Sequence, residues 1–119
     1  YYKTAHYSLD EGYAAMAELL RDAPEITAVF AMADVMAIGA ARAVRDAGKR
    51  IPEDISLIGF DGLPICRFYD PRLSTVTQQV AFMAEKSYAV LLDMIENGAG
   101  AQHVLAPYTL EKTDSIRKI

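Results

Sequence analysis

The chain has 119 residues, of which 52% are hydrophobic and 24% are charged, and its net charge is −4. This length and composition predict one domain, or part of one, that can bury a core and has no disordered signature. The lysines and arginines are scattered rather than massed, so the charge pattern does not indicate a nucleic-acid-binding surface. No apolar run approaches the length of a membrane span, and we expect no membrane partner.

Cysteine and histidine are too few for disulfide or zinc chemistry. Cys66 is the single cysteine, and His6 and His103 lie far from it in the sequence. An internal disulfide is therefore excluded and a zinc site is not expected. We expect no metal and no cofactor, and a cytoplasmic, reducing setting is compatible with this composition. The chain starts at Tyr1 without an initiator methionine, so the lack of a signal peptide carries no information.

The first half of the chain alternates between helical and strand patterns. A capping box at Ser8–Glu11 predicts a helix over residues 9–23, which a proline ends. The apolar run 26–32 predicts a buried strand, and residues 34–48 predict a second helix with a stripe of small residues that can pack close to a sheet. Residues 55–59 predict another strand. This order implies parallel strands joined by crossover helices.

The second half begins with an apolar loop that contains two prolines, residues 62–73. So much apolar surface in a loop is either covered by its own domain or meets a partner. A short strand is predicted over 74–77, a helix over 79–97, and a final strand over 104–110, whose proline is typical of an edge position. Residues 113–119 read as a polar tail. The long helix is expected to face the core with four side chains: Met83, Val90, Leu91 and Met94.

The strand predicted at 55–59 ends in Gly-Phe-Asp-Gly, which places Asp61 at the carboxyl end of a strand. In open α/β sheets ligands bind just beyond these ends, and a carboxylate there can accept hydrogen bonds from a small polar molecule. On this motif alone, the alternative that Asp61 and Gly62 merely form a turn is slightly favoured. The chain has no phosphate-binding glycine loop and no catalytic triad setting. A general base at His6 is conceivable, but we expect no enzyme.

Three segments in fixed order carry a family resemblance: Ala33–Ala40, Ile51–Asp61 and Leu73–Gln78. Together they resemble the lactose-repressor/galactose-repressor (LacI/GalR) family of bacterial transcription regulators, and the match extends over almost the whole chain. The resemblance implies an α/β fold in which a Rossmann-like parallel sheet with flanking helices forms part of a periplasmic-binding-protein-like effector domain.

The resemblance further implies a place within that domain. The chain looks like its C-terminal part, with residues 1–62 and 104–119 in the second subdomain and residues 74–98 crossing to the first. The implied function is effector sensing and dimerisation, in which a small molecule, expected to be a sugar, controls DNA binding allosterically. The implied partners are this effector, a second copy in a homodimer, and operator DNA through an N-terminal helix-turn-helix that the sequence does not include.

Four positions correspond to the family's effector contacts, and three of them match the family's residue types. Asp61 matches a carboxylate that binds effector hydroxyls, Gln78 a polar residue at the interdomain crossing, and Tyr7 an aromatic ring that stacks on the effector. At the fourth position the family commonly has Asn where this chain has Ala33, so the ligand is expected to be less rich in hydroxyls or differently placed. Asp34 is retained, with helix capping as its expected role. The alternatives are a half-buried aromatic for Tyr7 and a turn residue for Gln78.

The resemblance also places Ile38, Ile65, Phe68 and Tyr69 on a dimer face. Packing of the same side chains inside their own chain is an equally good interpretation of the sequence. Two other functions compete with the regulator. A transport-type periplasmic binding protein would be marked by a secretion signal upstream, and a regulator by a helix-turn-helix. A flavodoxin-like enzyme has no motif in its favour.

Overall fold

The computed structural model describes residues 1–117, which form two compact units. The first unit comprises Tyr1–Thr77 and the chain from Leu110 onward, and the second comprises Gln78–Thr109. The predicted tail 113–119 lies partly outside the described residues. The elements in chain order are α1 (Leu9–Asp22), β1 (Ala28–Phe30), α2 (Asp34–Asp46), β2 (Ser56–Asp61), the short 3-10 helix η1 (Pro64–Arg67), β3 (Ser74–Gln78), α3 (Val80–Asn97) and β4 (Tyr108–Glu111).

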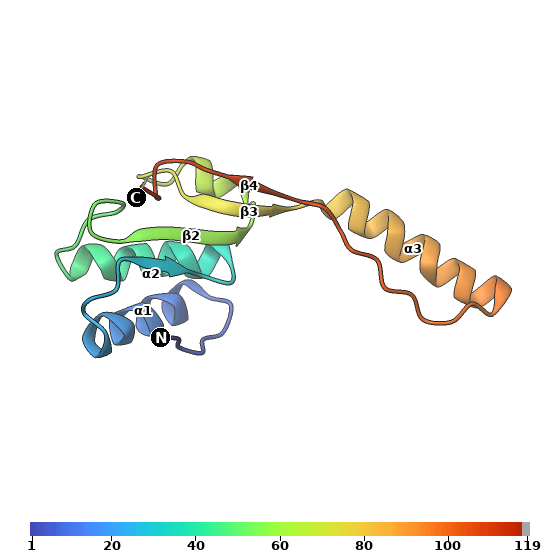
Figure 1. Cartoon of the computed structure of the whole chain (residues 1–119), viewed down its shortest axis with the longest axis horizontal. Coiled ribbons are helices and arrows are strands. Elements are labelled where there is room, and N and C mark those ends of the chain that lie inside the picture. Colours follow the sequence, from blue (N-terminus) through green and yellow to red (C-terminus); the bar gives the residue numbers. More distant parts are fainter. Residues whose placement is uncertain (118–119) are drawn as a thin grey trace. The chain divides into compact units, whose positions relative to one another are not determined.

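The strands form one sheet in the order β1-β2-β3-β4 (Figure 1). β1 pairs with β2 and β2 with β3, both in parallel, which confirms the parallel arrangement predicted from the alternation of elements. β4 is one of the two edge strands. Side-chain hydrogen bonds join Thr77 to Glu111 and Ser74 to Thr113, so the chain returns along β3 in the opposite direction. β4 is shorter than the predicted strand over 104–110 and starts after the proline, where backbone N–H groups become available.

α1 begins at Leu9 as predicted, and the Ser8 hydroxyl oxygen accepts a hydrogen bond from the Glu11 amide at 3.2 Å. α2 lies between α1 and β2 (Figure 1). Two glycines let the helices approach closely: a Cβ on Gly12 would collide with the Met36 backbone, and one on Gly39 with the Leu9 carbonyl. The small residues of α2 thus serve its contact with α1 as well as its contact with the sheet.

The hydrophobic core lies in the first unit. Its largest fully buried apolar side chains come from α1, α2, β2 and the segments that lead into β2 and β3. Apolar residues from elements far apart in sequence therefore meet between the helices and the sheet, as the alternating pattern requires. These side chains are Met16, Val44, Ile55, Leu57 and Leu73.

The segment interpreted from its sequence as a polar tail is part of this core. Ser115 is buried, and its hydroxyl donates to the Leu57 carbonyl at 2.6 Å while accepting from the Ser74 amide at 2.7 Å. Its own amide nitrogen donates to the Arg72 carbonyl at 3.0 Å. The tail prediction was wrong here, because a serine gives no sequence sign that its hydroxyl bridges two strands.

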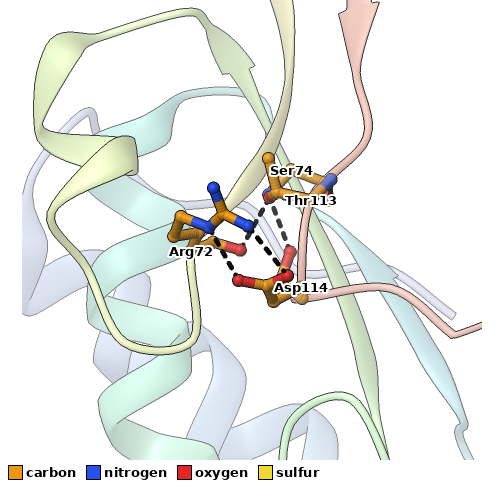
Figure 2. A network of polar contacts seen from close by, with 5 residues as sticks. Arg72, Ser74, Thr113 and Asp114 are labelled. Atoms are coloured by element: carbon orange, nitrogen blue, oxygen red, sulfur yellow. Dashed lines mark hydrogen bonds and ion pairs between the residues drawn. The ribbon is translucent and has the colours of Figure 1, made fainter.

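Polar contacts that Thr113 and Asp114 make with Arg72 and Ser74 join the returning chain to the start of β3 (Figure 2). Arg72 forms an ion pair with Asp114 at 2.8 Å. Both side chains are largely exposed, so forming the pair does not require either charge to be buried. The Thr113 amide donates to the Ser74 hydroxyl at 2.9 Å, and the Thr113 hydroxyl donates to the Arg72 carbonyl at 2.7 Å. The Arg72 guanidinium also lowers the pKa of Asp114 through this hydrogen bond.

The second unit is built around α3, an 18-residue helix that ends at Gly98 in the left-handed conformation, as predicted. None of its residues is buried, so the expected core stripe was wrong for this chain. Met83, Leu91 and Met94 are exposed, and Val90 is half-buried. Within residues 1–117, no helix combines the length and the apolar character that crossing a membrane requires.

Candidate ligand site at the carboxyl ends of the strands

Two of the residues predicted to contact a ligand lie in the first unit where neighbouring strands end. Ala33 follows β1 and is buried, and Asp61 is the last residue of β2. Gln78 is the last residue of β3 and belongs to the second unit. Parallel strands direct their carboxyl ends to one edge of the sheet, which is the edge where open α/β sheets bind ligands. The topology therefore supports the sequence-based choice of this edge.

Asp61 has an unusual backbone. Its φ is 119°, the only positive value at a non-glycine position among the described residues, and Gly62 follows with a φ of 80°. A side chain is seldom found in this region, which costs about 1–3 kcal/mol and persists where the surroundings enforce it. Strain of this kind is concentrated at functional sites. Register pairing of Asp61 with Thr77 places the strained residue at the last rung between β2 and β3.

The surroundings of Asp61 are organised by Asp34. The Asp34 carboxylate is fully buried, and it accepts hydrogen bonds from the Leu63 amide at 2.7 Å and from the Thr75 hydroxyl at 2.6 Å. The Thr75 oxygen in turn accepts from the Gly62 amide at 3.3 Å. Helix capping, the role expected for Asp34, was wrong: α2 has Ala33 at its N-cap and no side-chain cap, and Asp34 is its first residue.

A glycine and a cysteine complete the surroundings of this carboxylate. A Cβ on Gly59 would collide with an Asp34 carboxylate oxygen, so the first glycine of the Gly-Phe-Asp-Gly motif makes room for the carboxylate. Burial and a hydrogen bond to Asp34 raise the pKa of the Cys66 thiol to about 12. The thiol therefore remains neutral at physiological pH and acts as a buried donor rather than as a nucleophile.

Tyr7 lies in the segment before α1 and is 71% exposed, so the alternative of a half-buried aromatic does not describe it. It lines a pocket of 430 Å³ together with Phe30 and Met32, which lie at the carboxyl end of β1. The lining is mainly apolar. Within residues 1–117, neither Asp61 nor Ala33 belongs to that lining, so Tyr7 and Asp61 do not share this pocket.

The four residues predicted at a dimer face divide into two pairs. Ile38 and Tyr69 pack against the core, and the Arg45 guanidinium lies 5.1 Å from the centre of the Tyr69 ring. Ile38 and Arg45 are seven residues apart and share one face of α2, so this face borders Tyr69. Ile65 and Phe68 are exposed, Phe68 by 83%. Internal packing thus covers Ile38 and Tyr69 in part, whereas it leaves Ile65 and Phe68 exposed.

Sequence reasoning missed the residues that support the site. Thr75 was treated only as part of a strand, and Asp34 only as a cap. A signal was present in the chain, since a Cβ on Gly59 would collide with the Asp34 carboxylate and one on Gly62 with the Thr77 side chain. For metals, the described residues contain no group of three or more His, Cys, Asp or Glu side chains that could hold an ion.

Known proteins resemble this chain over nearly all of its length. Residues 1–116 match the family described as periplasmic binding protein-like domain. The chain is 37% identical over 116 residues to the HTH-type transcriptional regulator MalR of Clostridium butyricum, a match that covers 98% of this chain and 35% of that protein.

Two solved structures extend the comparison. A LacI family transcriptional regulator from Enterococcus faecium with bound ribose has 36% identity and a TM-score of 0.78, over 94% of this chain and 41% of that one. The lac repressor dimer bound to operator and the anti-inducer ONPF has 28% identity and a TM-score of 0.86, over 94% and 39%.

The chain spans between a third and somewhat more than two fifths of the length of these three proteins. All three are transcription regulators rather than transport proteins, and the fold class predicted from the sequence is the one they share with this chain. The chain belongs to the periplasmic binding protein-like domain family, and its relatives there are LacI-family transcription regulators.

Proposed function

We propose that this chain is the C-terminal part of the effector domain of a sugar-responsive, LacI-type transcription regulator. The observation that carries the proposal is Asp61, an acidic residue held in a left-handed backbone at the carboxyl end of β2. A regulator with bound ribose is among the relatives, and a carboxylate is a suitable acceptor for sugar hydroxyls. Gln78 and Tyr7 add an amide and an exposed ring, whereas Ala33 contributes only a small apolar surface.

Calorimetry on the full-length protein tests the role of Asp61. Ribose, glucose, lactose and cellobiose are titrated into the wild type and into Asp61→Ala. Loss of a charge-assisted hydrogen bond should cost about 1.5–3 kcal/mol, or roughly ten- to a hundredfold in affinity. Asp114→Ala is the matched control, because it removes an exposed carboxylate near the opposite end of β3. Unchanged affinity in a folded Asp61→Ala protein would return Asp61 to the role of a turn residue.

We propose that residues 78–98 of the second unit belong with the first subdomain of the intact regulator, whereas residues 104–109 belong with the other. The proposed division places residues 1–62 and 104–119 in one subdomain and lets 74–98 cross to the other. The separate compactness of Gln78–Thr109 and the exposed apolar side chains of α3 support it. Ala scanning of α3 in the full-length protein tests it: truncating Leu91 should lower stability there far more than in this chain, and equal effects would contradict the division.

Dimerisation is proposed through the face around η1. Ile65 and Phe68 supply exposed apolar side chains, and Ile38 and Tyr69 are partly buried against the core. Apolar side chains at the centre of an interface carry much of its energy. Phe68→Asp in the full-length protein should shift sedimentation toward monomer without loss of secondary structure. A Phe68→Asp protein that stays dimeric would place the interface elsewhere.

In the intact protein, another part of the chain would bind the operator DNA. The regulator would work in the cytoplasm, where the operator is, and would catalyse no reaction. The relatives are regulators, and one is bound to an operator. The effector would shift an equilibrium between two domain arrangements that differ in DNA affinity. We expect this chain alone to give no sequence-specific gel shift at physiological salt, since its net charge is −4. A specific shift at that salt would contradict the proposal.

A further inference from the structure

The burial of the Asp34 carboxylate calls for an explanation. The Asp34 side chain is fully buried, and removing a charge from water is costly unless hydrogen bonds compensate for the lost hydration. The compensating donors are not amides at the start of α2. They come from the turn after β2, from β3 and from the Cys66 thiol in η1, so the carboxylate connects α2 with three other segments.

The donors hold the two peptide units that follow Asp61. The Leu63 amide donates to one oxygen of Asp34, and the Gly62 amide donates to the Thr75 hydroxyl oxygen. Thr75 has one hydroxyl hydrogen, and at 2.6 Å from the other Asp34 oxygen that hydrogen is given to the carboxylate. The Thr75 lone pairs are therefore left to accept from Gly62. Two consecutive amides are fixed, one directly and one through a relay.

Fixing these amides fixes the orientation of Asp61. The Gly62 nitrogen belongs to the peptide plane that Asp61 begins, and Asp61 has a φ of 119°. A side chain in this region relaxes unless neighbouring contacts over-determine it. The same contacts explain both glycines of the motif, since Gly59 makes room for the carboxylate and Gly62 takes a φ of 80°.

We propose that Asp34 and Thr75 are positioning residues for the effector site, which hold Asp61 in its strained backbone so that its carboxylate is pre-oriented for the ligand. The inference rests on the proposed binding role of Asp61. Neither residue needs to touch the effector. Pre-orientation raises affinity because the ordering of the acceptor is completed before the ligand arrives.

The competing interpretation is that the same hydrogen bonds only join α2 to β2 and β3. Thr75→Val separates the two, because valine keeps the shape of the buried side chain and removes the hydroxyl. Thr75→Ser restores the hydroxyl. Ser74→Ala is the matched control: Ser74 is equally buried, one residue earlier in β3, and its hydroxyl accepts from Thr113 instead.

The experiment uses the full-length protein at a temperature where every variant is folded, with ribose, glucose, lactose and cellobiose as the probes in calorimetry. Thr75→Val should weaken binding of whichever probe the wild type binds by about three- to tenfold, and Thr75→Ser should bind within about twofold of the wild type. Ser74→Ala should lower stability without changing affinity. An equal loss of affinity in Ser74→Ala and Thr75→Val would overturn the proposal.

A double-mutant cycle supplies a readout that a structural role would not move. If Thr75 acts through Asp61, Thr75→Val should have no further effect on affinity in the Asp61→Ala background. Additive losses would overturn the proposal while leaving the binding role of Asp61 intact. Unchanged affinity in Asp61→Ala alone would refute the proposed function instead.

Crystal structures of the Thr75→Val and Thr75→Ser proteins decide the backbone claim without any sugar. The expected result is that Asp61 leaves the positive-φ region in Thr75→Val and keeps it in Thr75→Ser. Retention of positive φ at Asp61 in a folded Thr75→Val protein would overturn the proposal, even if none of the four sugars binds.

Discussion

α2 and α3 are both helices with apolar stripes, yet the stripe of α2 is buried and that of α3 is not. Seven residues of α2 are buried, and α1 and β2 pack against it. None of the residues of α3 is buried, although the sequence of α3 is on average more hydrophobic than that of α2. Apolar periodicity therefore determines which face of a helix can be buried, and the neighbours determine whether it is buried. In the first unit the chain supplies those neighbours itself.

The sharpest way to break this comparison is to truncate one leucine in each unit. Leu57 in β2 is fully buried, and Leu91 in α3 is 57% exposed. Leu57→Ala should lower the free energy of unfolding of this chain by about 2–5 kcal/mol through lost burial and a cavity. Leu91→Ala should lower it by less than about 1 kcal/mol. Urea unfolding measures both, and similar losses would mean that α3 is covered in solution.

Serine gives a second pair. Ser115 bridges the Leu57 carbonyl and the Ser74 amide, whereas Ser87 on α3 is exposed. Ser115→Ala leaves two buried backbone groups without this partner, so we expect a loss of about 2–4 kcal/mol in the free energy of unfolding. Ser87→Ala should be neutral or slightly stabilising, because alanine is the better helix former. A neutral Ser115→Ala would show that water replaces the hydroxyl.

Glycine gives a third pair with a smaller expected effect. A Cβ at Gly39 would collide with the Leu9 carbonyl, so Gly39→Ala should push α1 and α2 apart at a cost of about 1–3 kcal/mol, despite the better helix propensity of alanine. Gly98, after α3, has open space around it and a φ of 66°. Gly98→Ala should cost only about 1 kcal/mol, for the left-handed backbone. Thermal unfolding followed by circular dichroism would rank the two variants, and the reverse ranking would contradict close packing of α1 on α2.

Local signals in the sequence located most of the elements. The capping box at Ser8–Glu11 and the glycine at residue 98 act within one helical turn, so their meaning does not depend on the rest of the fold. The parallel pairing of β1, β2 and β3 followed from the order of elements. The carboxyl-end position of Asp61 followed from the same pattern.

Other features could not be predicted, because they depend on partners distant in sequence. Thr75 and Asp34 are 41 residues apart, and Ser115 and Leu57 are 58 apart. No periodicity links such pairs. An aspartate at a helix start resembles a cap, and a serine near the C-terminus resembles a tail, until the sheet brings their partners close. The periodicity of α3 predicted a core stripe that is not buried here, since a stripe gives no sign of whether its neighbours are present.

The smallest expected effect concerns the one thiol. Cys66 is buried in the first unit, and its pKa is raised to about 12 by burial and by Asp34. Because the raised pKa favours the neutral thiol in the folded state, its contribution to stability is complete below the unfolded pKa of 9.0 and is lost as the pH rises toward 12. The free energy of unfolding of the wild type should therefore fall between these values more steeply than that of Cys66→Ala.

A thiol placed on α3 by Ser87→Cys in the Cys66→Ala background should react with a disulfide reagent at pH 8 at the rate of a free thiol, while Cys66 in the folded wild type should react only on unfolding. Equal reaction rates for the two thiols would mean that Cys66 is as accessible to the reagent as a residue on α3. The contrast between a buried first unit and an exposed α3 would then be wrong.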